Sequence, residues 1–356
     1  MHVNKNHLRQ TFMIIRLGKL IISTLLSVFV LTSCSDNNTV DQIKHNYDMT
    51  GFAKGADVSW LTEMETNGKK FYTTNGNEIE CLELLRSMGV NAIRLRVWVN
   101  PTGGWNGKKD LLAKALRAKE LGFRLMIDFH YSDTWADPGK QTIPVQWKNY
   151  NLQEMKQAVF NHTTDVLQTL KNKNINIEWV QVGNETATGM LWEMGRYSNE
   201  NKNNFAQLIN SGYDATKSIY PNAKVILHVD QGNKLGRFIW LFDGLKTNDA
   251  KWDIIGMSLY PEDNNWETVT NDCLDNVKIL MQRYGSEVVI CEVGMSWDSK
   301  YAEKFMNKIV TEAKDISGCL GVFYWEPECY NWKQYNKGAF DNNGKPTSAL
   351  NIFKDK

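Results

Sequence analysis

The chain has 356 residues, with 41 basic and 40 acidic side chains and a formal net charge of +1. This near balance excludes the strongly basic composition of a nucleic-acid-binding protein, so we expect no nucleic-acid partner. The length suits one large domain with a short extension and is ample for a buried core.

The first 33 residues have the order of an export signal. Four basic residues and no acidic ones precede an apolar run, Leu20–Leu31, which is too short to span a bilayer comfortably. The run ends in Leu31-Thr32-Ser33-Cys34, which resembles the lipobox of bacterial lipoproteins. We therefore expect residues 1–33 to be a lipoprotein signal peptide and Cys34 to be lipidated. An ordinary cleaved signal with a chance cysteine is the alternative.

Residues 34–50 predict a flexible tether, because Ser, Asp and Asn follow Cys34. Removal of residues 1–33 leaves 37 basic and 40 acidic residues, a net charge of −3. We expect an exported bacterial lipoprotein that the lipid at Cys34 attaches to a membrane, at the cell surface or in the periplasm.

The remaining cysteines are Cys81, Cys273, Cys291, Cys319 and Cys329. Their odd number and the lack of CxxC spacing argue against a disulfide framework and against a zinc site. Cys291 and Cys319 lie in or beside apolar runs and are expected in the core. A bridge among the others stays open.

Residues 51–356 alternate between short apolar runs and amphipathic stretches. The expected strands are Phe52–Val58, Ala92–Val97, Leu125–Phe129, Ile177–Val182, Lys224–Val229, Ile254–Leu259, Val288–Cys291 and Val322–Trp325. The expected helices are Glu78–Met88, Leu111–Leu121, Leu152–Lys171, Asn203–Ile219, Leu235–Leu245, Thr268–Tyr284 and Ala302–Ala313. Eight such repeats predict one α/β domain, a closed (β/α)8 (TIM) barrel. An open doubly wound sheet is the alternative, but no Gly-rich phosphate motif follows the first strand.

Two of the expected strands end in a glutamate. Glu185 follows the run Trp179–Asn184, and Glu292 follows Val288–Cys291. The carboxyl ends of barrel strands share one mouth, so these two side chains predict a carboxylate pair there. Each could instead be a helix cap or an ion-pair partner.

Polar and aromatic residues also end the other expected strands, which predicts an aromatic-walled cleft of the kind that binds sugars. Arg96 is expected to face the mouth and Arg94 to point the other way. His130 could be a core histidine, and Tyr260 and Trp325 could be packing residues. Trp135 lies on a polar loop, which favours contact with a ligand. For His228 and Asp230 the structural and functional interpretations are evenly balanced.

Three motifs, Gly55–Ser59, Arg94–Trp98 and Asp128–Gly139, together with the strand-end glutamates, resemble glycoside hydrolase family 53 of clan A. Members of that family are arabinogalactan endo-β-1,4-galactanases. The similarity runs from about Gly51 to the C-terminus. The Asp128–Gly139 motif is specific to the family, whereas the Asn184-Glu185 pair alone marks the clan.

The resemblance implies a retaining hydrolase of β-1,4-galactan and galacto-oligosaccharides, the side chains of pectic rhamnogalacturonan and type I arabinogalactan. Glu185 matches the general acid/base, and Glu292 matches the nucleophile, held ionised by Arg96 and the Tyr260 hydroxyl. Asn184 would bind the sugar 2-hydroxyl, and Trp325 would form the floor of the cleft. The other residues expected to bind substrate are Arg96, Tyr260, His130, Asp133, Trp135, Trp98, Trp297, Asp298 and Asp57.

We expect a monomer that requires no cofactor or metal. The segment Gly294–Lys304 is short compared with some bacterial relatives, in which a long loop holds a structural calcium ion. The motifs Asp263-Asn264-Asn265 and Asp341-Asn342-Asn343 are polar enough for calcium, but turn chemistry explains both. Calcium is therefore possible but not favoured.

Two other functions stay open. One is another clan A endo-glycanase, acting on mannan, xylan or glucan, which would share the glutamates but not the Asp128–Gly139 motif. The other is a non-catalytic glycan-binding lipoprotein at the cell surface, which would have no need of Glu185, Glu292 and Asn184. Whether cleavage is internal or from chain ends depends on whether both ends of the groove are open.

Overall fold

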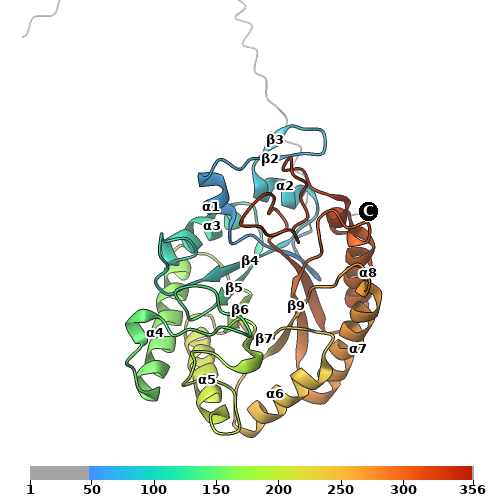
Figure 1. Ribbon diagram of the computed structural model, residues 1–356. Helices are drawn as coiled ribbons and strands as arrows, with labels where there is room; N and C mark the ends of the chain where they lie inside the picture. The colour runs from blue at the N-terminus through green and yellow to red at the C-terminus, as the bar shows by residue number, and fades with distance from the viewer. Residues whose placement is uncertain (1–47, 355–356) are drawn as a thin grey trace, which may run out of the picture. The chain divides into compact units, whose positions relative to one another are not determined.

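The structure is a computed structural model that describes residues 48–354 (Figure 1). The predicted signal peptide, Cys34 and all but the last residues of the predicted tether lie outside this range. Within residues 48–354, no helix has both the length and the apolar character needed to cross a membrane.

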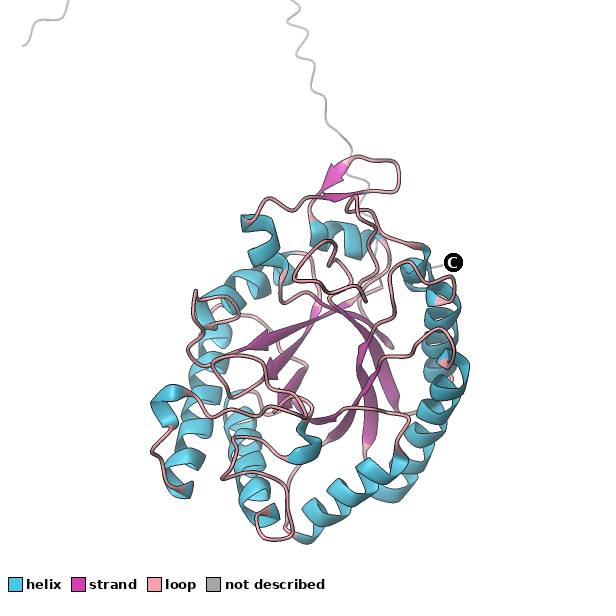
Figure 2. Ribbon diagram, viewed as in Figure 1, coloured by secondary structure: helices cyan, strands magenta, loops and turns pink. Residues whose placement is uncertain are grey.

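Eight parallel strands of the described chain form a closed barrel in the order β1-β10-β9-β8-β7-β6-β5-β4, and helices surround it (Figure 2). The strands are β1 (Ala53–Asp57), β4 (Ala92–Val97), β5 (Arg124–Phe129), β6 (Trp179–Val182), β7 (Lys224–Val229), β8 (Ile254–Leu259), β9 (Glu287–Val293) and β10 (Cys319–Trp325). The helices are α1 (Leu61–Thr66), α2 (Cys81–Ser87), α3 (Lys108–Glu120), α4 (Leu152–Lys171), α5 (Lys202–Ile219), α6 (Leu235–Thr247), α7 (Trp266–Tyr284) and α8 (Ala302–Lys314). The predicted (β/α)8 barrel is confirmed.

One predicted helix starts later than expected. The helix predicted from Glu78 begins at Cys81, because β3 (Glu78–Ile79) pairs with β2 (Phe71–Tyr72) in a small hairpin. The Glu80 carboxylate then caps α2 by accepting the Glu83 backbone N–H at 2.7 Å. Helix α1 and this hairpin were not predicted. Short 3₁₀ helices complete the fold: η1 (Val145–Trp147), η2 (Thr186–Thr188) and η3 (Ser348–Phe353).

The barrel interior changes from apolar to polar along the strands. Side chains two residues apart on a strand share a face, so Met126 of β5 is followed by Asp128, and Trp179 of β6 by Gln181. The apolar layer is formed by Ala53, Ala92, Met126, Trp179, Ile226, Ile254, Val289, Cys291 and Phe323. Buried polar groups lie above it toward the carboxyl ends, where enzymes with this fold have their active sites.

Strand β9 carries one extra residue where Glu292 lies. Met257 and Ser258 are consecutive on β8, but their partners on β9 are Ile290 and Glu292. The pairing with β10 shifts over the same stretch, before Val293. Such a bulge redirects side chains locally, and here it sets the direction of Glu292.

All five described cysteines, Cys81, Cys273, Cys291, Cys319 and Cys329, are buried free thiols. The expected core positions of Cys291 and Cys319 are confirmed. No bridge joins any of these five residues in the described chain.

Candidate active site

Glu185 lies at the mouth of the barrel, just beyond β6. Its backbone is left-handed, with φ 45° and ψ 53°, a conformation that non-glycine residues adopt rarely and that is enriched at active sites. The half-buried carboxylate accepts a hydrogen bond from Ser258 Oγ at 2.8 Å. Burial, followed by the nearby negative charges of Glu292 and Asp230, raises the pKa of Glu185 well above its usual value.

Glu292 is more deeply buried, with 5% of its surface exposed. Its Oε1 lies 2.8 Å from Arg94 Nη2, and its Oε2 accepts a hydrogen bond from the Tyr260 hydroxyl at 2.7 Å. Burial raises the pKa of Glu292 to about 7, while Arg94 and the Tyr260 hydrogen bond oppose that rise. The ionised form of Glu292 therefore has two stabilising partners.

The two glutamates are close enough to influence each other's charge. Ser258 is the register partner of Glu292 and donates its hydroxyl hydrogen bond to Glu185. Glu292 has a cation in contact, whereas Glu185 has only a hydroxyl, so the first proton bound by the pair goes to Glu185. The arrangement thus provides one carboxylic acid beside one carboxylate.

Arg94 corrects two of our predictions. We expected it to point away from the mouth, but residues i and i+2 on a strand share a face, so Arg94 and Arg96 both point inward. Arg94 lies 2.7 Å from Asp57 Oδ2 and 2.9 Å from Asp128 Oδ2, in addition to its contact with Glu292. Arg96, which was expected to hold Glu292, pairs with Glu326 instead.

Asn184 is fixed from several sides. Its Oδ1 accepts from Arg94 Nη2 at 3.0 Å, and its Nδ2 donates to the Ala136 carbonyl at 2.8 Å. Its own carbonyl accepts from Gln141 Nε2 at 2.9 Å. Gln141 is a supporting residue that we did not predict, because a glutamine on a long loop gives no pattern in the sequence.

The hydrogen bonds of His130 indicate which ring nitrogen donates and which accepts. Its Nδ1 accepts the N–H groups of Trp98 Nε1 and the Ala136 backbone, both at 3.2 Å. The proton therefore lies on Nε2, which donates to Asp128 Oδ2 at 3.0 Å. With 3% of its surface exposed, His130 positions the residues around it and offers little surface to a ligand.

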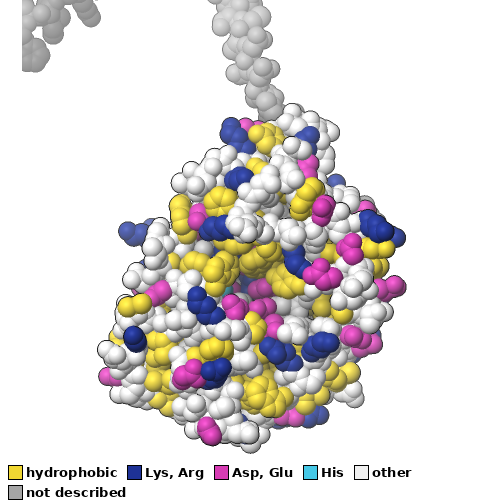
Figure 3. Space-filling view, in the orientation of Figure 1, with side chains coloured by type: hydrophobic (Ala, Val, Ile, Leu, Met, Phe, Trp, Pro, Cys, Tyr) yellow, Lys and Arg dark blue, Asp and Glu magenta, His cyan; other side chains and the backbone are white. Residues whose placement is uncertain are grey.

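Four tryptophans surround the Arg96 guanidinium: its carbon lies 5.3 Å from the ring of Trp60, 5.6 Å from Trp98, 4.4 Å from Trp135 and 6.0 Å from Trp325. These cation–π contacts fix the rings as an aromatic wall. Figure 3 shows hydrophobic side chains around a central hollow in which acidic groups lie. The predicted residues Trp98, Trp135 and Trp325 are thereby brought together, and Trp60 was missed.

A second pair of buried carboxylates lies below this wall. Glu326 accepts the Trp60 backbone N–H at 3.0 Å and pairs with Arg96. Glu328 has no exposed surface. Burial, and then the charge of Glu326, raises its pKa well above the usual value. We did not predict Glu328, because its sequence position lies beyond the strand end.

The other predicted site residues have different surroundings. Asp57 has no exposed surface, so it supports Arg94 from below and is not placed to touch a sugar. Both carboxylate oxygens of Asp133 accept loop backbone N–H groups, from Asn100 and Val145. Trp297 is half-buried and Asp298 exposed on the loop after β9. Their predicted sugar contacts stay predictions.

The two motifs considered for calcium are engaged in local hydrogen bonds. Asp341 Oδ1 accepts the backbone N–H groups of Asn343 and Lys345, both at 2.9 Å. Asp263 accepts the Ser299 hydroxyl. Among residues 48–354, no three His, Cys, Asp or Glu side chains are grouped to hold a metal ion. The expectation that no metal is required stays a prediction.

A hollow of about 480 Å³ opens beside Glu185. Asp230, Ser258 and Tyr260 line it together with that glutamate. Both Asp230 oxygens are occupied, by Arg237 Nε at 2.8 Å and Gln231 Nε2 at 2.9 Å. The hollow provides space for a leaving group next to Glu185.

A proton donor and a stabilised carboxylate at the mouth of a closed (β/α)8 barrel, next to an aromatic wall, are typical of glycoside hydrolases. Within that class the chain belongs to glycosyl hydrolase family 53, whose model matches residues 53–353. The predicted family is confirmed.

Named relatives and solved structures agree with this assignment. The chain is 30% identical over 332 residues to an arabinogalactan endo-β-1,4-galactanase of Thermothelomyces thermophilus, covering 85% of this chain and 98% of the relative. It is 30% identical to an endo-β-1,4-galactanase of Bacillus subtilis (strain 168), covering 78% of this chain and 70% of the relative. A fungal β-1,4-galactanase structure aligns with a TM-score of 0.78 at 28% identity over 85% of this chain and 99% of its own. The family 53 catalytic domain of Ignisphaera aggregans aligns with a TM-score of 0.77 at 31% identity over 85% of this chain and 95% of its own.

Proposed function

We propose that the protein is an endo-acting, retaining hydrolase of β-1,4-galactosidic bonds in galactan and type I arabinogalactan, the side chains of pectin. Family membership and the activities of the named relatives support the substrate. The different surroundings of the two glutamates support the mechanism: Arg94 and Tyr260 stabilise ionised Glu292, whereas Glu185 has a raised pKa and no cation in contact.

In the first half of the reaction, the Glu292 carboxylate attacks the anomeric carbon while Glu185 donates its proton to the leaving oxygen. The glycosidic bond breaks and a galactosyl ester forms on Glu292. Esterification removes the negative charge of Glu292, so the pKa of Glu185 falls. Glu185 then takes a proton from water, the water attacks the anomeric carbon, and the ester bond to Glu292 breaks. The galacto-oligosaccharide is released with the β configuration retained.

Asn184 has the position and the fixed geometry to bind the sugar 2-hydroxyl. One Nδ2 hydrogen is engaged with the Ala136 carbonyl, which leaves the second for a substrate oxygen. A hydrogen bond at the 2-hydroxyl strengthens as the ring approaches the oxocarbenium ion.

This double-displacement chemistry needs only carboxyl groups, so treatment with EDTA should leave turnover unchanged.

Digestion of linear β-1,4-galactan tests the proposal. We expect a spread of intermediate oligosaccharides early in the reaction, and proton NMR should show the β-anomer forming before mutarotation. Galactose or a single short product from the outset would contradict internal cleavage. First formation of the α-anomer would contradict retention, and cleavage of mannan, xylan or glucan with galactan untouched would contradict the substrate.

Azide rescue tests the two roles. Glu185→Ala and Glu292→Ala should each lower kcat by orders of magnitude while circular dichroism shows an intact fold. Azide can enter the space left at Glu292 and attack the anomeric carbon, so only Glu292→Ala should form a glycosyl azide of inverted configuration. Glu185→Ala can still form the ester, and there azide should give the retained anomer. The opposite pattern would exchange the roles.

We also propose that Cys34 carries a lipid that attaches the enzyme to a membrane. The supporting observation is the sequence Leu31-Thr32-Ser33-Cys34 directly after a basic and apolar segment.

A further inference from the structure

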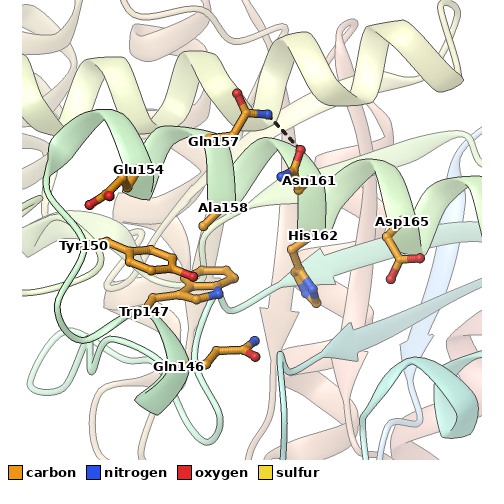
Figure 4. A pocket seen from close by; sticks show the side chains of 9 residues that line it. All are labelled: Gln146, Trp147, Tyr150, Glu154, Gln157, Ala158, Asn161, His162 and Asp165. Atoms are coloured by element: carbon orange, nitrogen blue, oxygen red, sulfur yellow. Dashed lines mark hydrogen bonds between the residues drawn. The ribbon is translucent and has the colours of Figure 1, made fainter.

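A second hollow, of about 540 Å³, lies between η1 and the outer face of α4 (Figure 4). Figure 4 shows Trp147 and Ala158 between Tyr150 on one side and His162 on the other. The small Ala158 side chain leaves room on this face of the helix. The lining residues are Gln146, Trp147, Tyr150, Glu154, Gln157, Ala158, Asn161, His162 and Asp165.

Apolar surface is exposed at this hollow. Tyr150, which lines the hollow, is 37% exposed, and Val145, which directly precedes the lining residue Gln146, is 81% exposed. They are two of the four large hydrophobic side chains exposed within residues 48–354. Trp147 also lines the hollow, and 5% of its surface is exposed. An exposed aromatic ring is a surface on which the C–H face of a sugar ring can stack.

Amide groups at the same hollow have unused hydrogen-bonding capacity. Gln157 Nε2 donates to Asn161 Oδ1 at 2.8 Å, so the Gln157 carbonyl oxygen and the Asn161 Nδ2 group remain for another partner. Gln146 is exposed and adds a third amide. Amides donate and accept together, as the hydroxyl groups of a sugar do.

The charge of the lining disfavours an acidic ligand. No Lys or Arg is among the lining residues, and burial lowers the pKa of His162 to about 4, so its ring is neutral. Of the two lining carboxylates, Asp165 is paired with Lys108 at 2.6 Å, and Glu154 accepts the Asn151 backbone N–H. The Glu154 carboxylate, which has no Lys or Arg of the described chain in contact, would repel a polymer of uronic acids but not a neutral one.

One continuous loop connects the active site with the hollow. Residues 130–136 begin at the barrel mouth and carry Trp135 of the aromatic wall, and the same loop then continues to η1. Asp133 joins the two parts by accepting the Val145 backbone N–H at 2.8 Å. Asp133 thereby ties the part of the loop at the mouth to the start of η1, which forms one wall of the hollow.

We propose that this hollow is a second carbohydrate-binding site that takes a neutral stretch of oligosaccharide, with Tyr150 as the stacking surface and the three amides as hydroxyl partners. That the neutral polymer is galactan rests on the proposed function. The site holds polymer close to the catalytic mouth and takes no part in bond cleavage.

Native gel electrophoresis through soluble galactan tests the proposal, using the full chain with Glu292→Ala so that the polymer is not digested. Tyr150→Ala removes the stacking ring, and Ala158→Leu fills the hollow without removing any polar group. We expect each to weaken retardation about three- to tenfold. Trp240→Ala, which removes an aromatic side chain that is 51% exposed on α6, is the matched control. Thermal unfolding verifies that each variant folds.

When Glu292 is kept, the Tyr150→Ala and Ala158→Leu variants should cleave short galacto-oligosaccharides at a rate within twofold of that of the unsubstituted enzyme. Their rate of cleavage should fall only on the polymer. Unchanged retardation in both variants would overturn the second site, as would binding of polygalacturonate in preference to neutral polymers. Failure of the proposed function has a different pattern. In that case galactan is neither cleaved nor bound, and another neutral polymer is retained through Tyr150.

Discussion

Arg94 is the residue on which the charge of the active site depends most directly. One guanidinium contacts three carboxylates, Asp57, Asp128 and Glu292. Burial raises the pKa of Glu292 to about 7, and the charges of Asp128 and Asp57 add to the rise, while Arg94 and the Tyr260 hydrogen bond oppose it. The balance between ionised and protonated Glu292 should respond to small changes in its partners.

Tyr260→Phe tests that balance, because the Tyr260 hydroxyl donates to Glu292 Oε2 and lowers its pKa. In the proposed mechanism activity needs ionised Glu292, so activity should be lost as the pH falls through the pKa of Glu292. Without the hydrogen bond that pKa rises, so the acid limb of the kcat/KM profile should move upward by about one pH unit. Tyr335→Phe is the control, since that hydroxyl donates to the Lys337 carbonyl at 3.2 Å. An unchanged or lowered acid limb for Tyr260→Phe would contradict the assignment.

The burial of Glu328 has a predicted effect on the stability of the protein. The pKa of Glu328 in the folded protein lies above its value in the unfolded chain, which is about 4.3. The contribution of Glu328 to stability is therefore full below about pH 4.3 and is lost as the pH rises toward the pKa of the folded protein. Glu328→Gln keeps the shape but cannot ionise. Its free energy of unfolding should exceed that of the parent by a margin that grows by about 1.4 kcal/mol per pH unit.

Urea unfolding at pH 5, 6 and 7 measures that margin for Glu328→Gln. Glu120→Gln, at an exposed position near the end of α3, is the control and should show a small difference that does not change with pH. A constant margin for Glu328→Gln, or one that shrinks as the pH rises, would mean that Glu328 is ionised in the folded protein.

At the scale of elements, the bulge of β9 directs Glu292, the proposed nucleophile, and a glycine on β8 leaves room for the preceding residue, Cys291. A Cβ at Gly256 would lie 2.7 Å from Cys291 Sγ and 2.8 Å from Ile226 Cγ2. Gly256→Ala should therefore force β9 to move and cost about 1–3 kcal/mol of unfolding free energy. It should also lower kcat, because Cys291 directly precedes Glu292.

Gly236→Ala on α6 is the matched control for Gly256→Ala. A Cβ there would meet nothing within 4 Å, and alanine favours helix over glycine by up to about 1 kcal/mol. Thermal unfolding should show an unchanged or higher Tm for Gly236→Ala and a lower Tm for Gly256→Ala. Equal values for the two variants would show that the barrel absorbs the extra methyl group without moving β9.

Regular elements could be predicted because their periodicity is local. The strands Ala92–Val97, Lys224–Val229 and Ile254–Leu259 and the helix Leu152–Lys171 have the predicted bounds. The β9 bulge could not be predicted, because an extra residue is defined only by the register of the neighbouring strands. The start of α2 was missed for the same reason, since the pairing of β3 with β2 decides it.

At the scale of the whole molecule, the proposed lipid at Cys34 determines where the enzyme is found. Cys34→Ser should prevent incorporation of labelled palmitate and move the protein from the membrane fraction to the soluble fraction. Hydrolysis of galactan per molecule of enzyme should not change, because the substitution lies outside the barrel. Membrane association that persists without the cysteine would contradict lipid anchoring.

The barrel and the two glutamates could be predicted because eight repeats bring strand ends to one mouth. The charged contacts beneath them could not, since they join residues far apart in the sequence. Glu326 and Glu328 illustrate this, because their surroundings include Trp60, Asp57 and Arg96 from the first part of the chain. Arg94 was misplaced through a wrong use of strand alternation, and the sequence alone would have allowed the right assignment.

Closure of the barrel has a consequence for folding. Asp57 on β1, Arg94 on β4 and Glu292 on β9 meet only after the chain has travelled almost the full circle. A chain that has emerged from the ribosome only as far as β8 still lacks Glu292, one of the three carboxylates that Arg94 contacts. Hydrolytic competence therefore arises in the last stage of synthesis. A truncated product that lacks β9 and β10 would be inactive, because Glu292 is absent, and destabilised, because the barrel cannot close.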